Sequence, residues 1–300
     1  MPELGLGLHV GDADADSIIG SSGGGIAPPP PPPPSDGLLK LEDDSGVYLT
    51  EGGDYLAFEL PSLWTPSNTS STVGWWDASD SSTITTSGSE VTAVTDKSGN
   101  GYTLQRGTTG PNYGTRTLNG LNVFEFSGAN YNTLENNSFA WDQANNALGF
   151  VAIYRLDDDG LTEQDFLLSG TNSSTRIGVR RLTDQRWQIL VTGGSITTAS
   201  ALGTEPVTQM MVARFNAGSS SIRIDGSTEA FGTIGSVAFS KINISGNYLE
   251  QQGVEGFIAE MIFFSDLTET QKIEGYLAHK WGLESNLDSS HPYALAAPTI

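Results

Sequence analysis

The chain has 300 residues and a net charge of −21, with 14 Lys and Arg against 35 Asp and Glu. Such a surface repels phosphate backbones, so the composition excludes the basic footprint on which nucleic-acid binding depends. Charged residues make up only 16% of the chain, which holds 36 glycines and no cysteine. This balance is typical of short strands joined by tight turns, without disulfide bonds.

Residues 1–27 are rich in Gly, Ser and Asp and show no periodicity. They predict an arm that is flexible or ordered only by a partner. The N-terminus lacks the basic and apolar regions of a secretory signal peptide. No later stretch approaches the ~20 apolar residues of a membrane helix, so we expect no membrane insertion.

A run of seven prolines, Pro28 to Pro34, follows the arm. Residues 28–35 are therefore predicted to form a polyproline II spacer. Residues 36–72 contain three short apolar runs separated by Gly-containing turns, which indicate a small β-meander. Three short strands are marginally stable alone, so we expect this meander to dock onto a neighbour. The predicted docking residues are Pro28, Pro34, Tyr48, Tyr55 and Phe58.

From residue 73 to residue 300 the pattern is all-β, with apolar or alternating runs and no helix between most of them. Such spacing predicts an antiparallel β-sandwich. Asp225-Gly226 predicts a type I′ hairpin turn. One amphipathic helix is expected from Glu269 to Trp281, begun by a capping box of Thr268 and Gln271 and ended at Gly282.

Three stretches resemble the laminin-G-like, or concanavalin A-like, jelly-roll family. They are WWDASD (75–80), GPNYGTRTLNGLNVFEFSGANY (110–131) and GFIAEMIFFSDLTETQKIEGYLAHKWGL with a following SSHPY (256–293). The resemblance implies a jelly-roll sandwich with one short C-terminal helix. Residues 36–60 also resemble segments of structural proteins in marine tailed phages. That likeness implies a virion component, namely a tail fibre, a baseplate attachment or a capsid decoration.

Catalytic patterns are missing from the sequence. Retaining glycosidases need two carboxylates about 5 Å apart, and no E-x-D-x-E strand supplies them. Glu260 lies in an apolar strand, and we interpret it as a structural carboxylate at a sheet edge or bonded to a loop. No G-x-S-x-G nucleophile motif occurs, and His279 and His291 are expected to pack or cap. The sequence therefore predicts a protein that is not an enzyme.

Candidate ligand residues lie on loops. Asn100, Tyr102, Tyr113 and Tyr131 occupy Gly- and Asn-rich segments, where aromatic rings can stack on sugars and amides can bind hydroxyls. Asp157 and Asp159 are weak candidates for calcium, because the same residues also suit an ordinary turn. No cofactor is otherwise expected.

Together these features predict a non-enzymatic phage virion protein that displays a lectin-like sandwich. Its expected partners are other virion proteins, bound through the arm, and a host-surface glycan, unless the sandwich only stabilises or shields the particle. A homo-oligomer is expected, because virion attachments follow closed symmetry. The alternatives are a bacterial extracellular carbohydrate-binding protein and, less favoured, a polysaccharide-degrading enzyme.

Overall fold

The computed structural model describes residues 61–300, apart from residues 144, 158–162, 170–174, 202–205 and 248. Pro61–Ile300 form one compact unit. The predicted arm and spacer and the docking residues Pro28, Pro34, Tyr48, Tyr55 and Phe58 lie outside the described residues. Residues 61–72, which the sequence groups with the meander, belong to the compact unit, where Trp64 is buried.

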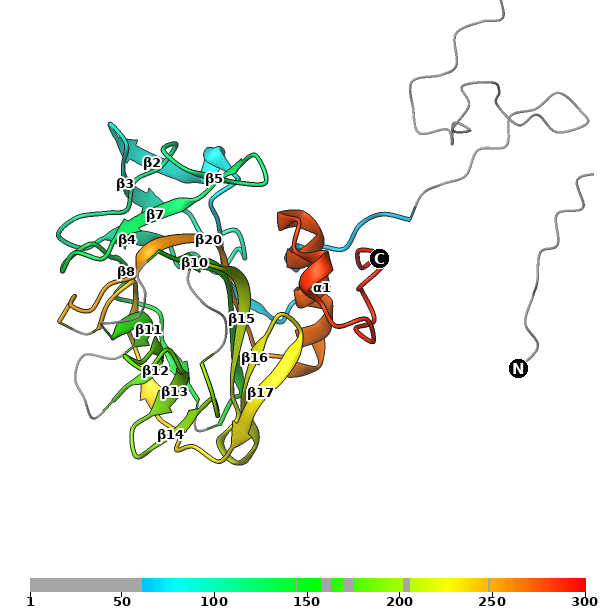
Figure 1. The fold of residues 1–300 in the computed structure, drawn as a ribbon. Coiled ribbons are helices and arrows are strands. Elements are labelled where there is room, and N and C mark those ends of the chain that lie inside the picture. Colours follow the sequence, from blue (N-terminus) through cyan, green and yellow to red (C-terminus); the bar gives the residue numbers. More distant parts are fainter. Residues whose placement is uncertain (1–60, 144, 158–162, 170–174, 202–205, 248) are drawn as a thin grey trace, which may run out of the picture. The chain divides into compact units, whose positions relative to one another are not determined.

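Two antiparallel sheets form the layers of a sandwich, and the helix α1 (Thr270–Trp281) lies outside them (Figure 1). This arrangement confirms the predicted fold class. The seven-stranded sheet has the order β1 (Thr72–Asp77), β20 (Glu255–Phe264), β10 (Leu148–Leu156), β15 (Thr208–Phe215), β16 (Ser220–Ile224) and β17 (Ser227–Gly232), while β7 (Phe124–Ser127) also pairs with β20. The nine-stranded sheet has the order β14 (Gly194–Thr197), β13 (Trp187–Val191), β12 (Ile177–Arg181), β11 (Gln164–Ser169), β19 (Ile242–Ile244), β8 (Leu134–Asn136), β4 (Leu104–Arg106), β3 (Glu90–Val94) and β2 (Ile84–Ser87).

Smaller elements complete the fold. Two short pairs are β18 (Ala238–Phe239) with β9 (Trp141–Asp142), and β5 (Thr117–Leu118) with β6 (Leu121–Asn122). Single-turn 3₁₀ helices occur at Pro66–Asn68, Ser81–Thr83, Ala217–Ser219, Leu267–Glu269 and Glu284–Asn286. Within the described ranges, no helix is both long and apolar enough to cross a membrane.

The seven-stranded sheet is buried on both faces. Along β10, Phe150 and Tyr154 belong to the apolar layer between the sheets, whereas Val151 and Ile153 belong to a second layer under α1. Alternate residues of a strand point to opposite faces, so a strand covered on both sides reads as a continuous apolar run. That burial explains the unbroken hydrophobic character of β10 and β20.

Two predicted turns are confirmed. Asp225 and Gly226 have φ angles of 48° and 82°, the positive pair that a type I′ turn between β16 and β17 requires. Gly282 ends α1 in the left-handed region, with φ 68° and ψ 37°.

The predicted capping box is wrong. The Asp266 side chain accepts from the Thr268 backbone N at 2.9 Å and from its hydroxyl at 2.6 Å. An Asp side chain readily bonds the backbone two residues on, and here it forms a 3₁₀ turn first. As a result α1 begins at Thr270, one residue later than predicted, and its N-cap residue Glu269 makes no side-chain capping bond.

The Glu260 side chain holds α1 against the sheet. It is fully buried on β20, and its two oxygens accept from Trp75 Nε1 at 2.6 Å, Tyr276 Oη at 3.1 Å, Lys280 Nζ at 2.6 Å and Trp281 Nε1 at 2.8 Å. Because β20 lies between β1 and β10, the predicted place at a sheet edge or loop is wrong. Burial and the nearby Asp77 carboxylate raise the pKa of Glu260, while Lys280 and Trp281 oppose the rise.

A chain of alternating charges extends from Glu260 toward solvent. Lys280 Nζ also lies 2.7 Å from Asp77, Lys97 Nζ lies 2.8 Å from Asp77, and Lys97 reaches Asp80 at 2.8 Å. Burial opposes ionisation of Asp77, yet Lys280 and Lys97 hold its pKa below the ordinary value. Each buried carboxylate therefore depends on a lysine for compensation.

A second ion pair joins α1 to β16 and the C-terminal tail. Glu274 is fully buried and accepts from Arg223 Nε at 2.7 Å and Nη2 at 2.9 Å. His291 Nε2 lies 3.2 Å from the same carboxylate, and His279 Nε2 lies 2.8 Å from the Tyr293 carbonyl oxygen. Both histidines therefore pack the tail against α1, as predicted.

Replacing Lys280 with Met is expected to lower the free energy of unfolding by about 3–5 kcal/mol, because two buried carboxylates lose their shared cation. Urea denaturation at pH 7 measures the change. Lys272→Met is the matched control on the same helix, because Lys272 pairs with no carboxylate among the described residues and its Nζ lies 5.4 Å from the Trp64 ring centroid. Equal losses for the two variants would contradict the buried-charge interpretation.

Candidate functional site

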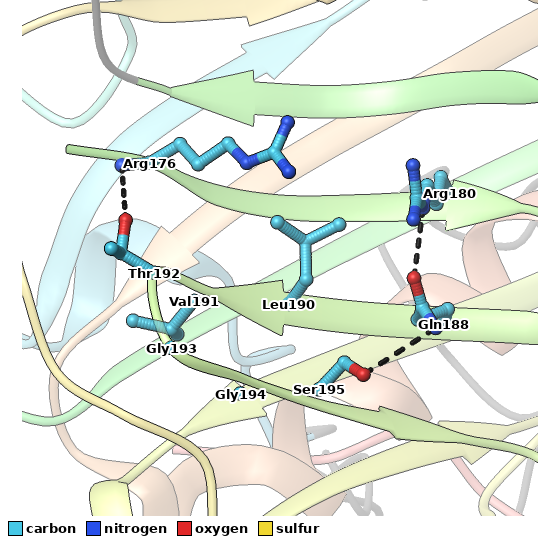
Figure 2. Close-up of a pocket in the computed structure, with 9 residues that line it drawn as sticks. All are labelled: Arg176, Arg180, Gln188, Leu190, Val191, Thr192, Gly193, Gly194 and Ser195. Carbon is cyan, nitrogen blue, oxygen red and sulfur yellow. Dashed lines mark hydrogen bonds between the residues drawn. The ribbon is translucent and has the colours of Figure 1, made fainter. Parts of the chain in front are cut away.

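A shallow depression lies on the outer face of the nine-stranded sheet, over β12, β13 and β14 (Figure 2). The inward residues of these strands, such as Val179 and Ile189, belong to the apolar layer between the sheets. Alternation therefore turns Arg180, Gln188 and Leu190 to the outside. We call this depression the shelf; its volume is about 330 Å³, and it is lined by Arg176, Arg180, Gln188, Leu190, Val191, Thr192, Gly193, Gly194 and Ser195.

One glycine and one leucine form the floor of the shelf. Gly178 pairs with Leu190, and Leu190 pairs with Ser195 on the next strand. Both residues are buried, and 5% of the Leu190 surface is exposed. Figure 2 shows Leu190 between the two arginines.

Polar groups surround that floor. Arg180 Nε donates to Gln188 Oε1 at 2.9 Å, and Arg180 Nη1 donates to Glu163 Oε1 at 2.6 Å. Gln188 Nε2 donates to Thr197 Oγ1 at 2.9 Å. These bonds fix the directions of the guanidinium and the amide, so the rim is pre-organised for a polar ligand.

The Arg176 guanidinium makes fewer polar contacts than the Arg180 guanidinium. The backbone N of Arg176 donates to Thr192 Oγ1 at 3.2 Å. Within the described part of the chain, the Arg176 guanidinium forms no hydrogen bond or ion pair, and it extends along the strand toward Arg180 (Figure 2). The shelf volume lies at the lower end of the range for small-molecule sites, which begins near 300 Å³.

Asp165 lies beside the shelf in the sheet. It pairs with Arg180 across β11 and β12, and only 1% of its surface is exposed. Burial, reinforced by the Glu163 carboxylate, raises the pKa of Asp165 to about 7, although Arg180 and Arg176 act in the opposite direction. Its charge therefore changes near neutral pH.

Three of the predicted ligand residues make structural contacts. The Tyr102 ring lies 4.7 Å from that of Phe139, and the Tyr113 ring lies 6.2 Å from that of Phe124. Asn100 Nδ2 donates to the carbonyl oxygens of residues 72 and 73 at 3.1 and 3.0 Å. These contacts close loops over the edge of the sandwich.

Tyr131 is exposed, at 45%, and has a φ of 67°. Its backbone N donates to the Glu250 carbonyl oxygen at 2.5 Å, which joins two loops. None of the four predicted residues lines the shelf, and all four stay predicted ligand contacts.

Asp157 forms ion pairs with two arginines. It accepts from both Nη atoms of Arg116, in one case at 2.9 Å, and from Arg155 Nε at 3.1 Å. Arg116 lowers the pKa of Asp157, against the effect of burial. Asp159 lies outside the described residues, and among those described no group of three His, Asp or Glu side chains could hold a metal.

A second depression, of about 370 Å³, is lined by Asp157 with Asn112, Glu125, Phe126, Ser127, Glu255 and Gly256.

The fold brings together one carboxylate pair that sequence spacing could not reveal. Asp77 on β1 and Glu260 on β20 are direct partners across the sheet. Lys280 bridges them at 2.7 and 2.6 Å, and their exposed fractions are 2% and 0%. Because α1 covers both groups, a substrate cannot reach this pair in the observed arrangement.

Sequence reasoning missed the shelf residues Arg176, Arg180 and Gln188. The available signal was alternation, since polar or small residues at 176, 178 and 180 separate apolar residues at 177 and 179. That pattern marks a strand with one open face. It does not show which neighbouring strands complete the surface.

No known protein family model matches the chain, and no curated protein is similar to it. Solved structures with a similar arrangement include a Trypanosoma rangeli sialidase in complex with sialic acid, at 15% identity and a TM-score of 0.43, covering 73% of this chain and 33% of that one. The binding domain of botulinum neurotoxin serotype D gives 13% identity and a TM-score of 0.48, covering 67% and 49%. The botulinum neurotoxin DC binding domain in complex with rat synaptotagmin II gives 11% and 0.47, covering 65% and 48%. The chain spans less than half the length of each of these structures.

Asp165→Asn is expected to stabilise the protein more at pH 8 than at pH 5. The raised pKa of about 7 means that folding binds a proton between about pH 4 and pH 7, so the Asp165 contribution to stability falls as pH rises through that window. Asparagine cannot ionise and avoids this loss. Thermal unfolding midpoints at the two pH values measure the difference.

Asp184→Asn is the matched control, because Asp184 is exposed and its pKa is lowered by Arg186. The Asp184→Asn substitution should not raise the thermal unfolding midpoint at pH 8. A lower midpoint for Asp165→Asn than for the wild type at pH 8 would show that the charged form is well compensated.

Proposed function

We propose that this chain is a non-enzymatic virion protein of a tailed phage, and that its sandwich binds a host-surface glycan on the shelf. The observation that carries the proposal is the pre-organised polar rim around Leu190 on the open face of the nine-stranded sheet. The seven-stranded sheet has no comparable free face under α1, because its outer side packs against the helix.

The chemistry of the shelf suits a sugar. A pyranose offers hydroxyl groups at its edge and an apolar face, and the shelf offers a guanidinium, the Gln188 amide and the Ser195 hydroxyl around a leucine. Gln188 and Arg180 already orient each other, so less side-chain freedom is lost on binding. A depression this shallow leaves the rest of a polysaccharide chain in solvent.

Burial of the Asp77–Glu260 pair supports a binding role over glycoside hydrolysis. Both carboxylates bind Lys280, and two tryptophan N–H groups occupy Glu260. In this environment they stabilise the fold, and they lie on the opposite layer from the shelf. The virion role itself rests on the resemblance of residues 36–60 to phage structural segments.

A glycan array probed with the full chain is expected to give binding that Gln188→Ala weakens about tenfold, the size of one or two lost hydrogen bonds. Gln105→Ala is the matched control, since Gln105 is an exposed glutamine on β4 of the same sheet. Unchanged binding of Gln188→Ala would move the glycan site away from the shelf.

On purified phage particles, mass spectrometry and immunogold labelling are expected to find the full-length chain and not a variant lacking residues 1–60. The reason is that the arm, spacer and meander are the predicted anchor. Finding neither form on particles would reject the virion role and favour a bacterial carbohydrate-binding protein.

A further inference from the structure

The shelf places two positive charges on a strongly acidic protein. The chain carries a net charge of −21, yet the outward positions of β12 present Arg176 and Arg180 on the same face. They are four residues apart along an extended strand, which is about 13 Å between their Cα atoms at ~3.3 Å per residue. The Arg176 side chain extends toward Arg180 and shortens the gap between the charges (Figure 2).

Both guanidinium groups keep donors for a ligand. A guanidinium has five N–H donors. Arg180 uses its Nε and Nη1 atoms for the bonds to Gln188 and Glu163, whereas the Arg176 guanidinium forms no hydrogen bond with the residues of the described ranges. A planar guanidinium can donate two parallel hydrogen bonds to two oxygens of a carboxylate or a sulfate.

The local charge favours an anion in spite of the acidic surroundings. Glu163 compensates Arg180, and Asp165 lies beneath the surface with 1% exposure. Arg176 forms no ion pair with the described residues and interacts with the buried Asp165 carboxylate electrostatically, so its guanidinium leaves a positive charge on the solvent side of the shelf. At ordinary ionic strength, charges more than about 8–10 Å away are largely screened, so the nearest arginines dominate for a bound group.

We propose that the shelf selects anionic sugars, with Arg176 and Arg180 binding the carboxylate or sulfate of one sugar unit. This inference rests on the proposed glycan-binding function and adds the substrate class. The amide of Gln188 then contacts hydroxyl groups of the same unit, while the arginines distinguish charged sugars from neutral ones.

The test measures binding of the full chain to three immobilised polysaccharides: alginate for carboxylates, carrageenan for sulfates, and dextran as a neutral chain. The variants are Arg176→Gln and Arg180→Gln, and the matched control is Arg106→Gln, an exposed arginine on β4 paired with Glu90. Thermal unfolding confirms that each variant is folded.

We expect the wild type to bind alginate or carrageenan at least tenfold more tightly than dextran. Each shelf arginine variant should lose about tenfold of that affinity, the scale of a charge-assisted hydrogen bond, and the control should change less than about twofold. Binding to alginate alone identifies a carboxylate, and binding to carrageenan alone identifies a sulfate ester.

Two results would overturn the inference. If the wild type binds neither anionic polymer, or if the arginine variants bind them as the wild type does, the shelf does not select anionic sugars. The proposed glycan-binding function fails separately, when the wild type binds no glycan on the array. Tight dextran binding that Gln188→Ala abolishes and the arginine variants leave intact would keep that function and reject the anionic class.

Discussion

A single buried carboxylate organises one side of this protein. Glu260 receives N–H and O–H donors from β1 and from α1, so the last helix, the first strand and the central strand β20 meet at one charge. Removing such a group from water costs several kcal/mol, which only a full set of donors offsets. The aromatic rings that supply those donors also form the apolar layer under α1. As a consequence the seven-stranded sheet has no free face under the helix.

Local sequence signals predicted the parts of the fold that depend on neighbouring residues. The Asp225-Gly226 turn and the Gly282 helix end follow from turn chemistry, and the structure confirms them. The Thr268–Gln271 capping box failed because Asp266 offered a closer acceptor. The prediction for the position of Glu260 was wrong for a different reason. Its partners lie 185 residues earlier, at Trp75, and 16 to 21 residues later, in α1, and no spacing rule predicts that meeting.

The candidate site was harder to predict than the fold because it is a surface shared by three strands. Tyr102 and Tyr113 stood out as loop aromatics, yet each ring packs against a phenylalanine. The shelf depends on register instead. Gly178 lies opposite Leu190 and Arg180 lies opposite Gln188, and a shift of one residue in β12 would turn both arginines into the core. Sequence patterns give the alternation within a strand, but not the pairing that sets which side chains are neighbours.

The first and last described residues of the sandwich meet on the helix side. Trp64 N donates to the Pro298 carbonyl oxygen at 2.9 Å, Ile300 N donates to that of Ser62 at 2.9 Å, and Trp64 belongs to the apolar layer with α1. The shelf lies on the opposite layer, beyond the core between the sheets. The two ends of the described chain and the shelf therefore lie on opposite layers of the sandwich. A force that separates these two ends would act first on the bridge between Leu63 and Thr299 and on the two neighbouring hydrogen bonds, without crossing the sheets.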